Sequence, residues 1–348
     1  MITSLVFLSS GIFLGWSLGA NHAGIFWGTA VGTKMVRFKT AALLCSIFVV
    51  LGAVIGGSGA SGTLNKLGTI EHIAAAFTVA LAAAATTYAM SRAGLPISTS
   101  QAIIGGIIGW NVYSHRLTDY IVLVKIALTW VISPILTGLI TFLLFKIVQY
   151  FFNRTKMHMV QIDNLTRLGL IIVGIFGSYA LGANNIGNVM GVFVSSNPFK
   201  TIHFMNIISL DPTKILFFVG GIAIAVGVST YSKKVMSTIG NNLYRFSPIT
   251  ALIVVLSVSL TMFLFASSTI HHFLVSNGLP AFPLVPISAS QAIIGAVIGL
   301  GIARKNVDVN FQQLRKIIVG WIVTPIFAFL ISYISLYFIE NVFLQVVN

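Results

Sequence analysis

A fourteen-residue segment occurs twice in this chain and constrains the fold more than any other feature. The stretch Pro96-Ile-Ser-Thr-Ser-Gln-Ala-Ile-Ile-Gly-Gly-Ile-Ile-Gly109 returns as Pro286-Ile-Ser-Ala-Ser-Gln-Ala-Ile-Ile-Gly-Ala-Val-Ile-Gly299, with eleven identical residues at a separation of 190 positions. Each copy joins a polar Ser-x-Ser-Gln cluster to about ten apolar residues, too few to cross a hydrocarbon core of about 30 Å. Paired half-length segments with polar tips are typical of transporters built from internal repeats.

The composition places the chain in a membrane. Hydrophobic residues make up 57 % of the sequence and charged residues 7 %, whereas soluble domains carry about a quarter charged residues. Strand-like alternation is weak, so we expect helices rather than a barrel. The first segment has no basic n-region and is interpreted as a mature helix. Apolar segments of near-spanning length lie at 2–20, 40–60, 72–90, 119–152, 168–192, 213–229, 248–268 and 317–339.

The net charge of +14 does not indicate nucleic-acid binding, because the basic residues flank apolar segments as positive-inside signals do. The single cysteine, Cys45, excludes a disulfide framework and is expected to be a small buried side chain. His271-His272 has no third ligand nearby, so a polar loop is favoured over a metal site. We expect no metal and no cofactor beyond a coupling ion.

The repeat extends over both halves of the chain. Leu18-Gly-Ala-Asn21 recurs as Leu181-Gly-Ala-Asn184, and Lys125, Trp130 and Pro134 are matched by Lys316, Trp321 and Pro325. We therefore predict a first membrane repeat at 1–152, a polar linker at 153–166 and a second repeat at 167–348, together forming one transporter domain.

The positions of the basic residues allow the orientation to be predicted. With the N-terminus outside, the basic loops near 33–39, 153–167 and 231–247 lie inside. This requires an odd number of crossings in the first half, with 119–152 broken near Pro134 into two, and the second half is then inverted. The cluster Arg304, Lys305, Arg315 and Lys316 would lie outside if the second hairpin is purely re-entrant, and this conflict stays open.

Both hairpin motifs have the spacing of a helix start. Ser98 with Gln101 and Ser288 with Gln291 match a capping box, and Pro96 and Pro286 exclude helix just upstream. An exposed helix N-terminus offers unpaired N–H groups and about half a positive charge. Two such ends from opposite halves would surround a small oxyanion; alternatively, these side chains only cap their own helices and bond between helices.

The Gly-Ala-Asn motifs place a polar side chain beside small residues in apolar helices. Glycine permits close backbone approach or local unwinding, and asparagine supplies a carbonyl and an amide, which suit a coupling cation and an anion respectively. The alternative is a packing seam of small residues with one polar link. Lys34, which follows the first motif, is interpreted as an interfacial residue.

Taken together, these motifs resemble the inorganic phosphate transporter family, the PiT group, over essentially the whole chain. Family members carry Gly-Ala-Asn-Asp in each half and Pro-[Val/Ile]-Ser-[Ser/Thr]-[Thr/Ser]-[His/Gln] hairpins; the matches here begin at Gly19, Pro96, Gly182 and Pro286. The resemblance implies an all-α integral membrane protein with two inverted repeats, broken helices and paired re-entrant hairpins. It also implies a dimeric secondary transporter whose hairpin tips bind a tetrahedral oxyanion.

The substrate-binding residues that the resemblance implies come from the four motifs. They are Asn21, Asn184, Ser98, Thr99, Ser100, Gln101, Ser288, Ser290 and Gln291, with Ala289 standing where Thr99 stands in the first hairpin.

This chain departs from the family at both aspartates, which are replaced by His22 and Asn185. Phosphate near pH 7 carries a proton that a carboxylate can accept, whereas sulfate does not, so the loss fits sulfate at least as well. It also removes anionic ligands for sodium. His22 titrates near physiological pH and is a candidate for proton coupling, together with Asn185 as an ion-coupling position; alternatively, His22 is a neutral hydrogen-bonding residue.

The sequence therefore predicts an ion-coupled symporter for a tetrahedral inorganic oxyanion, with phosphate as the family default. The alternatives are a proton-coupled sulfate permease and, third, a passive anion channel. The coupling ion is H⁺ or Na⁺. No catalytic constellation is visible, so we do not expect an enzyme. We expect a multi-pass protein of the cell membrane, in contact with the lipid bilayer, that forms a homodimer.

Overall fold

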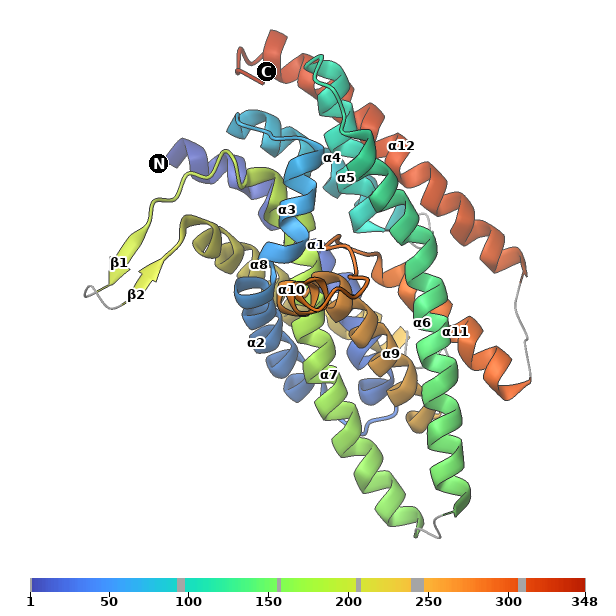
Figure 1. Ribbon diagram of the computed structural model, residues 1–348. Coiled ribbons are helices and arrows are strands. Elements are labelled where there is room, and N and C mark those ends of the chain that lie inside the picture. Colours follow the sequence, from blue (N-terminus) through green and yellow to red (C-terminus); the bar gives the residue numbers. More distant parts are fainter. Residues whose placement is uncertain are drawn as a thin grey trace.

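The computed structural model describes residues 2–92, 98–154, 158–204, 208–238, 247–305 and 311–347. Pro96 of the first repeated motif and Arg245 of the basic loops lie outside these residues. The first half of the chain consists of helices of very different lengths (Figure 1). They are α1 (Ile2–Gly32), α2 (Phe38–Gly56), α3 (Ser58–Leu67), α4 (Ile73–Arg92), α5 (Thr99–Tyr113) and α6 (Tyr120–Arg154).

The second half also combines long and short helices, but its shortest helix, α10, follows α9, whereas α3 precedes α4. It also contains one antiparallel hairpin of two short strands that lies apart from the helices in Figure 1. Its elements are α7 (Met159–Met190), the 3-10 helix η1 (Gly191–Phe193), β1 (Ile202–Phe204), β2 (Ile208–Leu210), α8 (Pro212–Thr238), α9 (Pro248–Ala266), α10 (Ser268–Ser276), α11 (Ala289–Arg304) and α12 (Phe311–Asn341). Within the predicted linker, Met159 to Thr166 form the first turns of α7.

Among the described residues, seven helices are long and apolar enough to cross a membrane. They are α2, α4, α6, α7, α8, α9 and α12. Large apolar side chains cover the outer faces of α6 and α12, as expected where helices meet lipid. The protein is therefore a multi-pass, all-α membrane protein, as the sequence predicted.

The predicted break of segment 119–152 near Pro134 is wrong. Helix α6 runs without interruption from Tyr120 to Arg154 with Pro134 inside it. Proline lacks a backbone N–H, which leaves the Trp130 carbonyl without its helical donor, and membrane helices tolerate the loss of one such bond. The Thr137 hydroxyl donates to the Ser133 carbonyl at 2.7 Å and the Thr141 hydroxyl donates to the Thr137 carbonyl at 2.8 Å, so both add bonds in the following turns of α6.

The half-length helices pack in parallel against long helices of the opposite half. Helix α5 lies along α12, where a Cβ on Gly105 would collide with the Pro325 carbonyl, and α11 lies along α6, where a Cβ on Gly295 would collide with the Pro134 carbonyl. Only glycine permits such close backbone contact. The contacts of α1 with α8 and of α2 with α7 follow the same cross-half rule. Each half therefore completes its packing with helices of the other.

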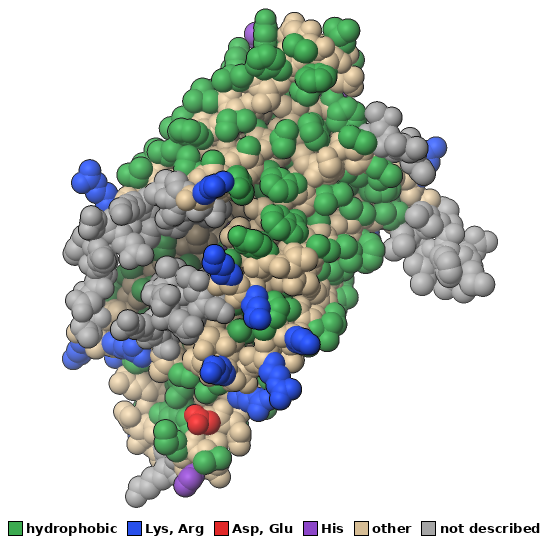
Figure 2. Space-filling view, turned by 180° about the vertical axis from the view of Figure 1, so that it is seen from behind, with side chains coloured by type: hydrophobic (Ala, Val, Ile, Leu, Met, Phe, Trp, Pro, Cys, Tyr) green, Lys and Arg blue, Asp and Glu red, His purple; other side chains and the backbone are tan. Residues whose placement is uncertain are grey.

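The basic loops gather at one end of the molecule. The Lys233 ammonium lies 6.0 Å from the ring centroid of Phe38, and the Arg304 guanidinium lies 5.6 Å from that of Phe145 near the end of α6. We call the end of the molecule where Lys233 and Arg304 lie the basic end. Figure 2 shows Lys and Arg side chains gathered in the lower part of one face, below a mostly hydrophobic upper part.

The structure resolves the conflict over Arg304 and Lys305. Helices α9 and α11 are the two arms of the second hairpin, so α11 returns to the end from which α9 started. The Lys146 ammonium donates to the Ala303 carbonyl at 2.9 Å, which fixes the end of α11 beside the last turns of α6. Arg304 and Lys305 therefore lie at the basic end, which answers the question that the sequence left open.

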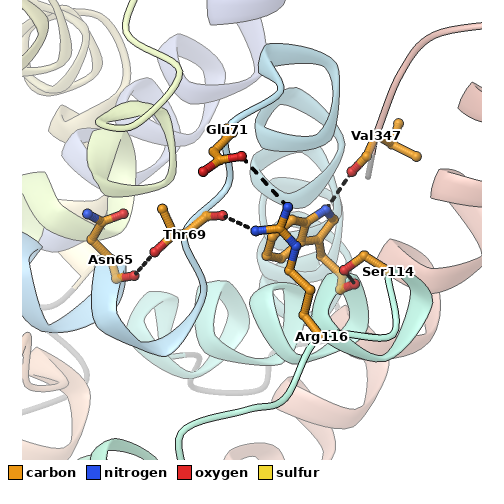
Figure 3. A network of polar contacts seen from close by, with 7 residues as sticks. Asn65, Thr69, Glu71, Ser114, Arg116 and Val347 are labelled. Carbon is orange, nitrogen blue, oxygen red and sulfur yellow. Dashed lines mark hydrogen bonds and ion pairs between the residues drawn. The ribbon is translucent and has the colours of Figure 1, made fainter.

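Both chain termini lie at the opposite end of the molecule (Figure 1). There the end of α5 is tied to the C-terminus, because the Trp110 indole donates to the Val347 carbonyl at 2.8 Å and the Tyr113 hydroxyl donates to Glu340. The Arg116 guanidinium lies 5.1 Å from the ring centroid of the same indole. Figure 3 shows Arg116 directed toward Glu71 and Thr69, 3.7 Å from a Glu71 carboxylate oxygen and 3.4 Å from the Thr69 carbonyl. These contacts anchor the end of α5 away from its polar tip.

Candidate anion site at the hairpin tips

The two repeated motifs begin helices in the same way. Ser98 precedes α5 and Ser288 precedes α11, both with extended backbone, and each hydroxyl accepts a hydrogen bond from the backbone N–H of the glutamine three residues on, at 3.3 Å. This is the N-cap geometry that the spacing predicted. Each motif therefore presents the positive end of a helix dipole.

The tip of the first hairpin touches the start of the second. The Ser100 hydroxyl donates to the Ile287 carbonyl at 3.3 Å, although the two residues are 187 positions apart. Asn184 binds both sides of Ile287: its amide donates to the Ile287 carbonyl at 2.9 Å, and its side-chain oxygen accepts from the Ile287 N–H at 3.0 Å. The second Gly-Ala-Asn motif therefore fixes the backbone just before α11.

Further polar side chains surround this contact. Asn188 donates to the Ser100 hydroxyl at 2.8 Å and to the Asn185 side-chain oxygen at 3.1 Å, and the hydroxyls of Ser288 and Ser290 are 2.8 Å apart. All three asparagines of α7 named here are buried. The Asn188 amide is used in these two contacts, and among the described residues its Oδ1 is buried without a partner. The cluster is thus polar but uncharged, so the helix N-termini beside it are the groups that suit an anion.

The electrostatics of the cluster favour an anion. Thr99 lies in the first turn of α5 and is buried, while Ala289 replaces it in α11. The sequences of α1, α5 and α11 contain no acidic residue, and the one in α7, Asp163, is in its first turns. None of these four helices therefore places a carboxylate near the N-termini of α5 and α11.

The glycines of the Gly-Ala-Asn motifs serve close packing. A Cβ on Gly19 would collide with the Ile224 carbonyl, and a Cβ on Gly182 would collide with the Val49 carbonyl. Helices α1 and α7 continue through both motifs without unwinding. Of the two roles considered for these glycines, close backbone approach is the one that the structure displays.

The first Gly-Ala-Asn motif makes more local contacts than the second. The Asn21 amide donates to the Ser17 carbonyl at 2.8 Å, and Nδ1 of His22 lies 3.2 Å from the Leu18 carbonyl. Because a carbonyl only accepts, Nδ1 carries the proton in this contact. Helix α1 touches α11, as α7 touches α5. Among the described residues, no hydrogen bond joins Asn21 or His22 to a hairpin.

The glutamine side chains do not complete the predicted capping boxes. Within the described part of the chain, Oε1 of Gln101 and Oε1 of Gln291 are buried without a hydrogen-bond partner. Both side chains line a groove of about 950 Å³ between α6, α11 and α12, here called the α6–α12 groove. Its walls include Val131, Ile135, Leu139, Ile298, Ile302 and Ile322.

Two tryptophans border the same groove and are matched to the glutamines by register. Nε1 of Trp130 and Nε1 of Trp321 are also buried without a partner among the described residues. Gly295 packs at Pro134 and Gly105 packs at Pro325. One turn earlier in each parallel pair, Gln291 falls level with Trp130 and Gln101 falls level with Trp321. Each acceptor is thus level with a donor from the other half of the chain.

Sequence reasoning missed Asn188 as a site residue. It follows Asn184 by four positions and so shares one face of α7, a signal that the sequence contained. The paired tryptophans were recognised as part of the repeat, but their position beside the hairpin glutamines depends on the packing of α6 and α12.

Comparison with known proteins agrees with this architecture. The profile described as "Phosphate transporter family" matches residues 18–332 and 275–347. The structure is similar to a solved one named "The sodium-dependent phosphate transporter", with a TM-score of 0.78, 21 % sequence identity and coverage of 98 % of this chain and 99 % of the other. At that identity the likeness shows the fold.

Relatives carry names for two different anions. TK2061 of Thermococcus kodakarensis, which bears a provisional phosphate permease name, is 25 % identical, with coverage of 94 % of this chain and 95 % of the relative. "Sulfate permease CysP" of Bacillus subtilis is 27 % identical, with coverage of 93 % of this chain and 84 % of the relative. Since the family profile spans most of its length, the chain belongs to the phosphate transporter family.

Proposed function

We propose that this protein is a secondary active transporter that binds a tetrahedral inorganic oxyanion between its hairpin tips and couples its movement to an ion. The observation that carries the proposal is the contact of Ser100 with Ile287, which joins the N-terminal turn of α5 to the residue before the α11 cap. Two helix N-termini with buried hydroxyl and amide groups form a neutral anion site.

Phosphate is the first candidate for the anion. Support comes from the family to which the chain belongs and from the name of the solved structure that it resembles. The roles proposed for individual residues follow from the contacts. Ser98, Thr99, Ser100, Ser288 and Ser290 supply hydroxyls at the tips, while Asn184 holds the backbone before α11. Asn21, Gln101 and Gln291 are proposed as ligands from the family resemblance alone, because Asn21 bonds to its own helix and both glutamine side chains line the α6–α12 groove.

Sulfate is the second candidate, favoured by the missing aspartates. His22 and Asn185 stand where the family pattern has carboxylates, and sulfate carries no proton that would need one. The sulfate permease of Bacillus subtilis shows that this name occurs among the relatives. Proton coupling through His22 fits this candidate, whereas similarity to a transporter named as sodium-dependent favours Na⁺.

Two further proposals concern the architecture. The halves 1–152 and 167–348 are inverted repeats, which is supported by the opposite courses of α1 and α7: Gly11 packs beside Val189, and Gly174 packs beside Trp27. The functional assembly is a homodimer, as the family resemblance implies. Crosslinking in the intact membrane tests the assembly.

Uptake into proteoliposomes is the experiment that separates the candidate anions. Labelled phosphate and labelled sulfate are each offered with the other as competitor, with and without a sodium gradient. A phosphate symporter takes up phosphate and leaves sulfate outside; uptake of sulfate driven by a proton gradient supports the second candidate. A passive channel shows no uphill uptake, and its flux is insensitive to a protonophore. Absence of transport for both anions would overturn the proposal.

A further inference from the structure

The α6–α12 groove has the shape and surroundings of a lipid site. Its volume of about 950 Å³ is at the upper end of the range for ligand pockets, roughly 300–1,000 Å³. From Ala127 to Phe142 it follows α6 for about 22 Å, longer than half of a hydrocarbon core of about 30 Å. A whole acyl chain of one leaflet therefore fits along it.

The groove opens toward the membrane rather than into the protein. Ile135 is 66 % exposed, and Ile322 is 59 % exposed on the facing helix. The polar atoms of the glutamines and tryptophans at its floor are buried beneath this apolar lining. Alkyl chains are the ligand that such a surface binds best, because burying apolar area is the main source of affinity.

Basic side chains lie at the end of the groove that faces the basic end. Lys146 is one turn beyond the lining residue Phe142, with its ammonium 5.8 Å from the Phe142 ring centroid. Arg304 is two residues beyond Ile302, and Arg315 is one turn before Ile318. Arg304, Arg315 and the neighbouring Lys305 are exposed. Basic residues of α6, α11 and α12 thus each lie within about one turn of the last groove-lining residue of their helix at this end.

No acidic side chain from these helices neutralises this cluster. Helices α6 and α11 contain no Asp or Glu, and the one acid of α12, Glu340, is at its far end. The sequence between α11 and α12 adds one acid, Asp308, which lies outside the described residues. Basic residues between transmembrane helices at the headgroup level attract anionic lipid heads.

We propose that the α6–α12 groove binds an anionic phospholipid, with its acyl chains along α6 and α12 and its phosphate among Lys146, Arg304, Lys305 and Arg315. Charge complementarity selects the headgroup, and the apolar walls hold the chains. The upper part of the groove reaches Gln101 and Gln291, which belong to the hairpins. A bound lipid therefore contacts the helices that start at the anion site, and its binding does not depend on which anion is transported.

The test measures lipid binding directly, so it can succeed or fail whatever anion is transported. The full-length protein in neutral detergent is titrated with phosphatidylglycerol or with phosphatidylcholine of identical chains, and bound lipid is counted by native mass spectrometry. The triple variant Arg304→Gln, Lys305→Gln, Arg315→Gln is expected to bind phosphatidylglycerol at least about tenfold more weakly while phosphatidylcholine binding is unchanged. The matched control removes three exposed charges elsewhere, as Arg37→Gln, Lys39→Gln, Arg167→Gln.

A second variant fills the groove instead of changing its charge. Ile135→Trp with Ile322→Trp is expected to weaken the binding of both lipids, whereas Ile121→Trp with Ile334→Trp, exposed positions of the same helices outside the groove, is expected to leave both unchanged. Equal losses in the two charge variants, or no preference of the native protein for phosphatidylglycerol, would overturn the proposal. Efficient crosslinking of two Leu139→Cys copies would assign the groove to a second copy and also overturn it.

Discussion

The two Gly-Ala-Asn motifs have nearly the same sequence but make different contacts. In α7, Asn184 holds Ile287 on both sides and Asn188 binds Ser100, so this motif connects both hairpins. In α1, Asn21 and His22 bond to carbonyls of their own helix. The repeat equivalent of Ile287 is Ile97, which lies outside the described residues. For Asn21, the comparison therefore covers only its contacts within α1.

One position explains much of this difference. When the two motifs are aligned so that Asn184 matches Asn21, Asn188 matches Ile25. Helix α1 therefore has no side-chain amide at the position from which Asn188 of α7 binds Ser100. The comparison teaches that a duplicated scaffold can concentrate its hydrogen bonds in one copy. Helices α5 and α11 begin with the same N-cap contact, while the asparagine network comes from α7 in the second half.

Removing both helix caps at the tips is expected to have the largest effect. In Ser98→Ala with Ser288→Ala, uptake should fall to background, because hydroxyls from both halves are lost from the proposed site. Each lost N-cap costs about 1 kcal/mol, so thermal unfolding is measured alongside transport. The matched control is Ser247→Ala with Ser267→Ala, which removes the caps of α9 and α10. Undiminished transport would exclude the tips from the site.

Making α7 resemble α1 tests the asparagine network itself. Asn188→Ile leaves the buried Ser100 hydroxyl without its donor, at a cost of about 1–3 kcal/mol, which corresponds to a fall of roughly 5- to 150-fold in uptake at low anion concentration. The reciprocal variant Ile25→Asn is the control and should not raise uptake. If Asn188→Ile transports normally, the asymmetry between the motifs has no functional consequence.

The matched glutamine and tryptophan residues predict a smaller, pairwise effect. Trp130→Phe removes the indole N–H and makes the aromatic ring smaller, and we expect it to couple with Gln291→Leu by about 1 kcal/mol in a double-mutant cycle of anion affinity. The same coupling should join Trp321→Phe to Gln101→Leu. The crossed combination of Trp130→Phe with Gln101→Leu should be additive. Coupling in the crossed pair as strong as in the matched pairs would contradict the register argument.

The smallest effect is expected from a substitution that makes α1 resemble α7 at one position. His22→Asn keeps a hydrogen-bonding side chain at a buried position but removes the imidazole, the group proposed to carry the coupled proton. If His22 couples protons, the rise of uptake with acidity should flatten while anion affinity changes little. Initial rates between about pH 5 and pH 8, measured at fixed membrane potential, provide the check, with His158→Asn outside the site as the control. An unchanged pH profile rejects the coupling role.

Local sequence patterns predicted what depends on neighbouring residues. Ser98 and Ser288 were identified as helix starts because a hydroxyl three residues before a backbone N–H can cap it, whatever the rest of the chain does. The family and the membrane class followed from motifs and composition. The direction of the Gln101 and Gln291 side chains did not follow, because it depends on the space between α6 and α12.

One sequence-based expectation failed and one open question was answered by the tertiary structure. Pro134 was expected to break its segment, but α6 continues through it, because proline removes only one helical hydrogen bond. The side of Arg304 was left open by the sequence, and α9 and α11 form one hairpin that returns the chain to the basic end. The pairing of helix arms cannot be read from the order of apolar segments.

By itself, the sequence determined that two half-length helices start with capped, polar N-termini in a membrane protein of the phosphate transporter family. Capping and apolar length are local properties, so a duplicated motif of fourteen residues contains them completely. The tertiary structure decided that the two tips meet at Ser100 and Ile287, that Asn188 joins them, and that the glutamines turn toward the α6–α12 groove. These contacts join residues about 90 to 190 positions apart, and only the cross-half packing of glycine-lined helices brings them together.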